Sequence, residues 1–168
     1  AVPAHLAVDL VEELRVIEPF LRHLADGISL DVSYPPSSAW IDIDPTELRQ
    51  VLTNLVSNAR DATADEGSIA IRVYAGRSTS GATSGALWWF VDVADSGRGM
   101  PPEVLARVFE PYFTTKGESG TGIGLTTAND IVTRHGGTIT AASHPNRGTT
   151  FTIGFPAALV TTMAAPKR

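Results

Sequence analysis

Cysteine is absent from this chain of 168 residues, and no apolar run is long enough to cross a bilayer. Without cysteine, neither disulfides nor thiolate chemistry is available, which fits a reducing compartment. The start of the chain lacks the basic and then apolar pattern of a signal peptide. We therefore expect a soluble cytoplasmic domain, whether or not a longer parent protein is anchored in a membrane.

Positive charge is also scarce, because 13 Lys and Arg residues face 18 Asp and Glu residues, for a net charge of −5. This balance gives no electrostatic reason to expect nucleic acid as a partner. The four histidines have no spacing typical of a metal site or a catalytic triad. The length predicts one domain, residues 1–168, with a core over about residues 9–156.

Helical and strand-like periods of hydrophobic residues alternate along the chain. The clearest helical stripe, over residues 45–64, opens with Asp44 as a cap residue followed by Pro45. Helices interspersed with adjacent hairpins predict an α+β fold, with one sheet and helices packed on one face. Helices are expected at residues 9–24, 45–64, 101–108 and 121–135, and strands at residues 28–34, 40–43, 68–75, 87–95, 138–143 and 149–155.

Two glycine-rich turns are the first indication of a ligand. Gly97 and Gly99 follow an expected strand, while Gly122 and Gly124 belong to the turn that runs into the helix expected over residues 121–135. Glycine lets the chain pass close to phosphate oxygens, and a helix N-terminus offers unpaired N–H groups. Together the two turns indicate a nucleotide held by backbone amides, although one such turn alone more often marks a bend.

Polar side chains line one flank of the helix expected over residues 45–64. At about 100° per residue, Asn54, Asn58 and Asp61 fall beside the apolar stripe. Asparagine is unfavourable inside a helix, and its side-chain carbonyl suits a hard cation such as Mg²⁺. A solvated polar edge is the commoner explanation of two asparagines, so the helix alone leaves both interpretations open.

Asp95 ends the strand expected over residues 87–95. Strict alternation places it on the apolar face with Val91 and Val93, whereas Asp92 points the other way. An inward carboxylate is costly unless it has a partner, and an adenine amino group would be such a partner. The alternative is an aspartate that only initiates the turn after it. The inward direction of the side chain favours the interpretation that Asp95 contacts a ligand.

Residues 109–119 have no clear period and precede the second glycine turn. The segment contains Thr114, Thr115 and Lys116, and Thr121 follows it. A segment between a short helix and a phosphate-binding turn is typical of a nucleotide lid. Plain surface loops share this composition, so the segment itself does not decide between the two.

Taken in order, five motifs resemble the ATP-binding catalytic domain of sensor histidine kinases, within the superfamily of gyrase, heat-shock chaperone, histidine kinase and mismatch-repair ATPases. The resemblance covers roughly residues 9–156, and five motifs in order make it specific. It implies a Bergerat-type α/β sandwich with a mixed, largely antiparallel sheet, helices on one face, and ATP beneath a lid. The motifs are the N box LRQVLTNLVSNARDA (48–62), the G1 box DSGRGM (95–100), the F box FEPYFTTK (109–116), the G2 box GTGIGL (120–125) and the G3 box GTTF (148–151).

The resemblance implies ATP and Mg²⁺ as cofactors, and a role for individual residues. By analogy Asn58 is the Mg²⁺ ligand, and Asp95 contacts the adenine amino group. Gly97 and Gly99 would shape the base pocket, and Lys116 would reach the γ-phosphate. The full set implied in ATP binding is Asn54, Asn58, Asp61, Asp95, Gly97, Gly99, Met100, Phe109, Lys116, Thr121, Gly122, Ile123, Gly124, Leu125 and Thr149.

Asn54 and Ala62 carry finer distinctions within the superfamily. ATP-hydrolysing relatives usually have Glu at the position of Asn54 as a general base for water, and an amide cannot take a proton. The absence of this glutamate suits a kinase, which must keep the γ-phosphate of ATP for a protein acceptor. Many histidine kinases place an aromatic residue at the position of Ala62, but the sequence Asn-Ala-Arg-Asp-Ala resembles the nitrogen-regulator and cell-cycle branches.

No histidine of the chain is followed by the sequence pattern of the phosphoacceptor helices. The resemblance therefore implies a catalytic module that delivers the γ-phosphoryl of Mg·ATP to a histidine in the dimerisation domain of a parent protein, with a response regulator downstream. The isolated chain is expected to be a monomer without autophosphorylation, and the parent a homodimer. Two alternatives remain. One is an anti-sigma-type serine kinase, against which the F box argues. The other is a catalytically silent nucleotide-binding regulatory module, against which Asn58 and Asp95 argue.

Overall fold

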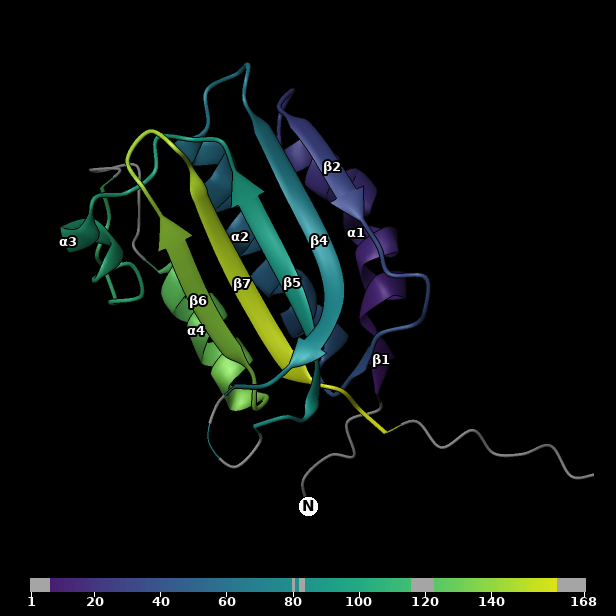
Figure 1. The fold of residues 1–168 in the computed structure, drawn as a ribbon. Coiled ribbons are helices and arrows are strands. Elements are labelled where there is room, and N and C mark those ends of the chain that lie inside the picture. Colours follow the sequence, from purple (N-terminus) through teal and green to yellow (C-terminus); the bar gives the residue numbers. More distant parts are fainter. Residues whose placement is uncertain (1–6, 80, 82–83, 116–122, 160–168) are drawn as a thin grey trace, which may run out of the picture.

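A five-stranded sheet with helices behind it forms most of the fold (Figure 1). The computed structural model describes residues 7–79, 81, 84–115 and 123–159. In chain order the elements are β1 (Val8–Asp9), α1 (Leu10–Leu24), β2 (Ser29–Ser33), β3 (Trp40–Ile41), α2 (Pro45–Ala62), β4 (Ser68–Arg77), β5 (Leu87–Asp95), α3 (Pro102–Leu105), α4 (Gly124–Arg134), β6 (Thr138–Ser143) and β7 (Thr149–Pro156).

The strand order of the large sheet is β2-β4-β5-β7-β6. Only β2 and β4 run parallel, and the other neighbours pair antiparallel. Helices α1, α2 and α4 all lie behind this sheet in Figure 1, on one face. The expected α+β class, with a mixed and largely antiparallel sheet, is confirmed. None of the helices in the described ranges is both long and apolar enough to cross a membrane.

The N-terminal end differs from the expected helix over residues 9–24. Asp9 belongs to the short strand β1 and caps α1, because its carboxylate accepts a hydrogen bond from the N–H of Val11 at 3.0 Å. The same carboxylate also accepts from the N–H of Ala39, just before β3, at 2.9 Å. β1 pairs antiparallel with β3 in a separate two-stranded sheet. β3 is only Trp40–Ile41, shorter than the strand expected over residues 40–43.

Three of the expected helices are also shorter in the structure. The helix expected over residues 45–64 ends at Ala62. The helix expected over residues 101–108 is α-helical only at Pro102–Leu105, because the N–H groups of Arg107 and Val108 bond to carbonyls three residues back. The helix expected over residues 121–135 begins at Gly124 in the described part of the chain and ends at Arg134.

Helix α2 is the element that positions most of the site. Its first turn is capped by the Asp44 carboxylate, which accepts hydrogen bonds from the N–H groups of Thr46 (2.8 Å) and Glu47 (3.2 Å). The helix packs between α1 and α4 and against β5. Its apolar stripe is completely or almost completely buried, as expected, at Leu48, Val51, Leu52, Leu55, Val56 and Ala59.

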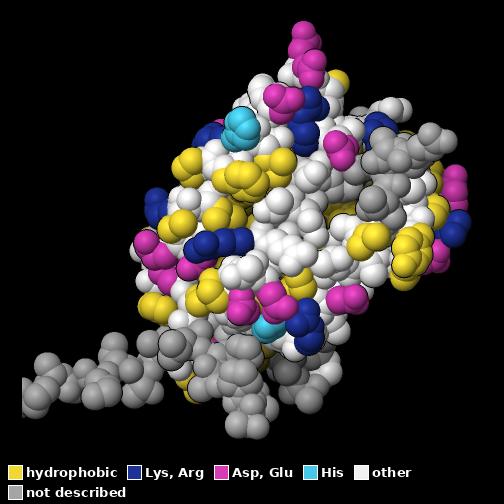
Figure 2. All heavy atoms as spheres, turned by 180° about the vertical axis from the view of Figure 1, so that it is seen from behind, with side chains coloured by type: hydrophobic (Ala, Val, Ile, Leu, Met, Phe, Trp, Pro, Cys, Tyr) yellow, Lys and Arg dark blue, Asp and Glu magenta, His cyan; other side chains and the backbone are white. Residues whose placement is uncertain are grey.

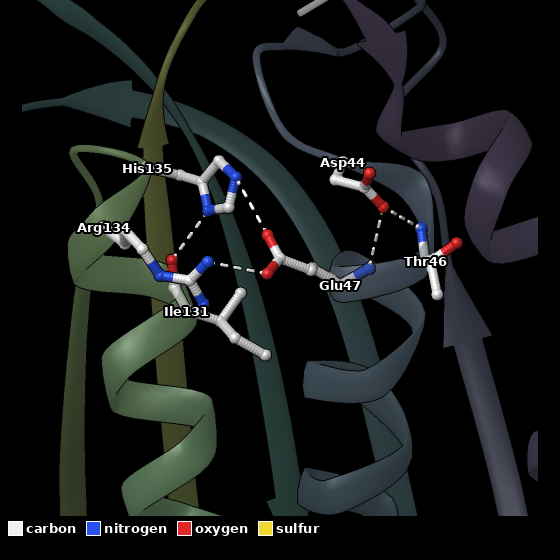
Figure 3. Close-up of polar contacts among 6 residues, drawn as sticks. All are labelled: Asp44, Thr46, Glu47, Ile131, Arg134 and His135. Atoms are coloured by element: carbon white, nitrogen blue, oxygen red, sulfur yellow. Dashed lines mark hydrogen bonds and ion pairs between the residues drawn. The ribbon is translucent and has the colours of Figure 1, made fainter. Parts of the chain in front are cut away.

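Polar contacts tie α2 to α4 at both ends of their interface. Near the start of α2, the Glu47 carboxylate lies 2.8 Å from a guanidinium nitrogen of Arg134 and 3.1 Å from Nε2 of His135 (Figure 3). The other ring nitrogen, Nδ1, lies 2.8 Å from the Ile131 carbonyl. Further along α2, Asn54 donates to the Gly124 carbonyl at 3.1 Å. The two helices are therefore held antiparallel, with the asparagine flank of α2 facing the start of α4.

Candidate functional site

A cavity of about 390 Å³ lies between the second half of α2, the turn after β5, the α3 region and the start of α4. A volume of this size is typical of small-molecule sites. In the order of the chain, its described lining residues are Asn54, Ser57, Asn58, Ala62, Arg98, Gly99, Met100, Pro101, Val104, Val108, Phe113, Thr114, Thr115, Gly124, Leu125 and Thr149.

The structure brings together residues from all five sequence motifs. Of the site residues expected from sequence, the lining includes Asn54, Asn58, Gly99, Met100, Gly124, Leu125 and Thr149. Five others lie outside the lining, namely Asp61, Asp95, Gly97, Phe109 and Ile123. Lys116, Thr121 and Gly122 lie outside the described residues, so their expected roles remain predictions.

Asp95 occupies the inner face of β5, as strand alternation predicts, and is only 8% exposed. One carboxylate oxygen, Oδ1, accepts hydrogen bonds from the N–H groups of Gly97 (2.8 Å) and Thr149 (3.3 Å). The other oxygen, Oδ2, is buried and has no hydrogen-bond partner in the part of the chain that the structure describes. A buried oxygen without a partner is unfavourable, and it is an acceptor available to a ligand that brings a donor.

Burial raises the pKa of the Asp95 carboxyl above its ordinary value of 3.8. The hydrogen bonds from the Gly97 and Thr149 amides act in the opposite direction, as does the positive charge of Arg98. Because burial dominates, the folded protein binds a proton at Asp95 more tightly than the unfolded chain does. The ionised carboxylate is therefore a cost to the fold.

The turn from Gly97 to Met100 lies in close contact with α2 on one side and with the β6–β7 hairpin on the other. A Cβ at Gly97 would lie 2.2 Å from the Ala62 carbonyl oxygen. Gly99 has a φ of +64°, and a Cβ there would lie 1.9 Å from the His144 carbonyl oxygen. Glycine is thus required at both positions by the packing of the turn against its neighbours.

The hairpin side of this turn contains a buried polar network. Ser143 Oγ accepts a hydrogen bond from the Met100 N–H at 2.8 Å and lies 2.8 Å from Thr149 Oγ1. Thr149 pairs with Asp95 across β5 and β7 and also lines the cavity. The carboxylate of Asp95 is thereby connected to the cavity wall through residues that are themselves buried and hydrogen-bonded.

Asn54 and Asn58 both line the cavity, and both are partly exposed. Within the described ranges, no group of three or more His, Cys, Asp or Glu side chains is arranged to hold a metal ion. The donor set fits a hard cation that takes one amide oxygen from the protein and its remaining ligands from water and a bound anion, as Mg²⁺ does. Asn58 is the residue that would hold it.

The start of α4 forms the opposite wall through Gly124 and Leu125. Among the described residues, Ile123 makes no side-chain cap hydrogen bond to this helix. The N–H groups of an uncapped helix N-terminus can bind an anion. Among the described residues, a Cβ at Gly124 would meet only the Asn54 Cγ within 4 Å, at 3.9 Å. Unlike Gly99, Gly124 is therefore not required by packing.

Sequence analysis did not identify Arg98, Ser57 or Phe113 as lining residues. Arg98 stands inside the G1 box, between the two glycines, and is the only charged side chain among the described lining residues. Elsewhere on the helix-bearing face, acidic and basic side chains are interspersed (Figure 2). Val104 and Val108 were also missed, although their spacing of four residues places both on one side of a helical turn.

Comparison with known proteins gives consistent matches. The model of the family described as histidine kinase-, DNA gyrase B-, and HSP90-like ATPase matches residues 43–159. The sensor histidine kinase ZraS of Klebsiella oxytoca is 40% identical over 159 residues, covering 92% of this chain and 32% of that protein. This chain therefore spans about a third of the length of that relative.

Two solved structures share the fold over nearly the whole chain. The catalytic domain of histidine kinase ThkA, in a nucleotide-free form, has a TM-score of 0.71 and 30% identity, covering 90% of this chain and 95% of that one. Full-length ShkA in complex with AMPPNP has a TM-score of 0.68 and 28% identity, covering 98% of this chain and 33% of that one.

We predict that Gly99→Ala costs more stability than Gly136→Ala. Both glycines have positive φ, +64° and +75°, but among the described residues a Cβ at Gly136 meets nothing within 4 Å. Gly136→Ala should cost about 1 kcal/mol from backbone strain, and Gly99→Ala about 2 kcal/mol more, because the His144 carbonyl must move. Urea unfolding measures both. Equal losses of unfolding free energy in the two variants would show that the turn accommodates a methyl group at residue 99 without additional strain.

We also predict a pH-dependent difference between the parent and Asp95→Asn. As pH rises from about the ordinary value of 3.8 through the raised pKa of Asp95, the parent acquires a buried charge that the variant lacks. The unfolding free energy of the variant should therefore rise relative to that of the parent across this range, and the difference should level off above it. A pH series of urea titrations tests this. If the unfolding free energy of the variant instead falls relative to that of the parent as pH rises, the ionised Asp95 carboxylate does not destabilise the fold.

Proposed function

The chain belongs to the family of histidine kinase-, DNA gyrase B- and HSP90-like ATPases. We propose that its cavity binds Mg·ATP and that the γ-phosphoryl group of this ATP is transferred to a protein histidine. The acceptor would be a histidine in the dimerisation domain of a longer parent kinase, and a response regulator would receive the phosphoryl group in turn. The observation that carries the proposal is a cavity lined by Asn58 and Thr149. Thr149 donates its N–H to Asp95, whose buried Oδ2 has no hydrogen-bond partner among the described residues.

Asp95 would identify the base. The 6-amino group of adenine donates hydrogen bonds, so it would satisfy Oδ2, whereas guanine has an oxygen at the same position. Gly97 and Thr149 hold the other carboxylate oxygen and so fix the direction of Oδ2. ShkA, a structural relative, was solved with the ATP analogue AMPPNP, which supports an adenine nucleotide as the ligand.

The phosphates would lie toward α4. Asn58 would hold Mg²⁺ through its side-chain oxygen, and the ion would neutralise phosphate charge. The N–H groups at the start of α4, at Gly124 and Leu125, would receive phosphate oxygens. Lys116, Thr121 and Gly122 are expected to contribute at this end of the site.

Asn54 favours a kinase over a hydrolase. Its side-chain amide donates to the Gly124 carbonyl, and an amide has no basic group with which to activate water. In a site that positions Mg·ATP without such a base, the γ-phosphate is preserved until an acceptor arrives. Phosphoryl transfer requires mainly positioning and charge neutralisation, which suits an acceptor supplied by another domain.

We predict that the chain binds Mg·ATP in preference to Mg·GTP, and that Asp95→Asn weakens ATP binding by about 1–3 kcal/mol, because an amide donor would face the amino group. Isothermal calorimetry measures both. The matched control is Asp92→Asn on the opposite face of β5, which is not among the lining residues and whose carboxylate accepts from Arg72, Tyr74 and Thr152. Equal affinities for ATP and GTP in the parent would contradict the assignment of Asp95 as the residue that recognises adenine.

We predict slow transfer of labelled γ-phosphate in trans to the dimerisation and phosphoacceptor segment of the parent kinase. Transfer should be slow because an untethered acceptor has a low effective concentration. The product should be acid-labile, as a phosphohistidine is, and Asn58→Ala should abolish it without changing the melting curve.

Other outcomes of the same transfer assay identify the alternatives. Acid-stable label on Ser or Thr would indicate an anti-sigma-type serine kinase. Tight Mg·ATP binding without transfer would indicate a regulatory module, and rapid hydrolysis by the chain alone would contradict the role given to Asn54.

A further inference from the structure

Arg98 is a charged residue of the cavity to which the proposed function gives no role. It is the only charged side chain among the described lining residues, and it is exposed at the cavity rim. It stands in the turn between Gly97 and Gly99, whose packing fixes the path of the backbone on both sides. Its position is therefore set by the fold before any ligand binds.

The backbone and the side chain of Arg98 are both held. Its N–H donates to the Ala62 carbonyl at 3.0 Å, and its own carbonyl accepts from the Asn146 N–H at 2.7 Å. The guanidinium donates to the Asp61 carbonyl at 3.1 Å. Because both partner carbonyls belong to the last residues of α2, the guanidinium lies over the C-terminal end of that helix.

This location is the Asp95 end of the cavity and not the α4 end. The charge of Arg98 acts on the Asp95 carboxyl, whose pKa it lowers against the larger effect of burial. Asn54, which contacts the start of α4, lies eight residues before Ala62, which is about 12 Å along a helix axis. Arg98 is therefore distant from the N–H groups proposed to bind phosphate.

Resting on the proposed function, we infer that Arg98 contacts the adenine ring and positions it, with its planar guanidinium lying against the base. A guanidinium is flat, weakly hydrated and suited to stacking on aromatic surfaces. The adjacent wall residue, Ala62, is small and leaves space beside the guanidinium. The base would thus be fixed at its amino group by Asp95 and on one side by Arg98.

Arg98 also stabilises the protein independently of any ligand, because it donates to a carbonyl in the last turn of α2 and places a positive charge at that helix end. A loss of stability on substitution would therefore say nothing about the base. The test must use ligands that share the base and differ in phosphate, and must use variants that remain folded.

Adenosine and Mg·ATP distinguish a base contact from a phosphate contact. Displacement of fluorescent trinitrophenyl-ATP reports both affinities, even for weak ligands. Arg98→Ala should weaken adenosine and Mg·ATP by the same factor, about fivefold. Arg98→Lys keeps the charge and a donor for the Asp61 carbonyl but loses the flat group, so its affinity should lie between those of Arg98→Ala and the parent. The control is Arg147→Ala, which removes an exposed charge of the neighbouring hairpin loop that does not line the cavity.

Each remaining outcome overturns the inference. Weaker Mg·ATP binding with unchanged adenosine binding would place the guanidinium on phosphate. Unchanged binding of both ligands by a folded Arg98→Ala would leave only the contact with α2, and parent-like affinity of Arg98→Lys would exclude a stacking role. Adenosine that fails to displace the probe from the parent would also overturn it. A parent that binds neither ligand would remove the proposed function as well, which separates the two failures.

Discussion

The close packing of the turn at residues 97–100 is the constraint on which the rest of the site depends. Its backbone donates to the end of α2 through Arg98 and to the hairpin residue Ser143 through Met100. Gly99 lies so close to the His144 carbonyl that a Cβ does not fit. One turn thereby fixes the distance between helix layer and sheet at the end of the cavity, and sets the direction of Asp95 through the Gly97 N–H.

Asp95 illustrates how a binding site can oppose stability. Burial raises the pKa of its carboxyl, so the ionised form that would accept from a ligand is the form that costs the empty protein free energy. The amides of Gly97 and Thr149 satisfy one oxygen and leave the other buried without a partner. An asparagine would keep an acceptor for these two amides without the charge, so the stability of the fold alone does not explain a carboxylate here. The proposed ligand, which brings a donor to this carboxylate, would explain it.

Much of this arrangement could be predicted from local sequence. The period of α2 identified its buried stripe and the flank that carries Asn54 and Asn58, and strand alternation placed Asp95 on the inner face. Arg98 and the packing of Gly99 could not be predicted in this way, because both depend on contacts with Asp61 and His144, which are distant in sequence. The early end of α3 at Leu105 was missed because a helical period does not distinguish an α-turn from a 3₁₀ turn.

Asn54 connects the proposed chemistry to the packing of α2 against α4. Its amide nitrogen lies 3.1 Å from the Gly124 carbonyl and so helps to hold the start of α4 beside the cavity. A glutamate at this position could serve as a base for water, but its carboxylate would bring an acceptor toward that carbonyl and lose the hydrogen bond. The position therefore cannot gain a general base without giving up a contact that holds the start of α4 beside the cavity. Since Glu47, Arg134 and His135 restrain only the opposite end of the two helices, nothing in their contacts replaces it.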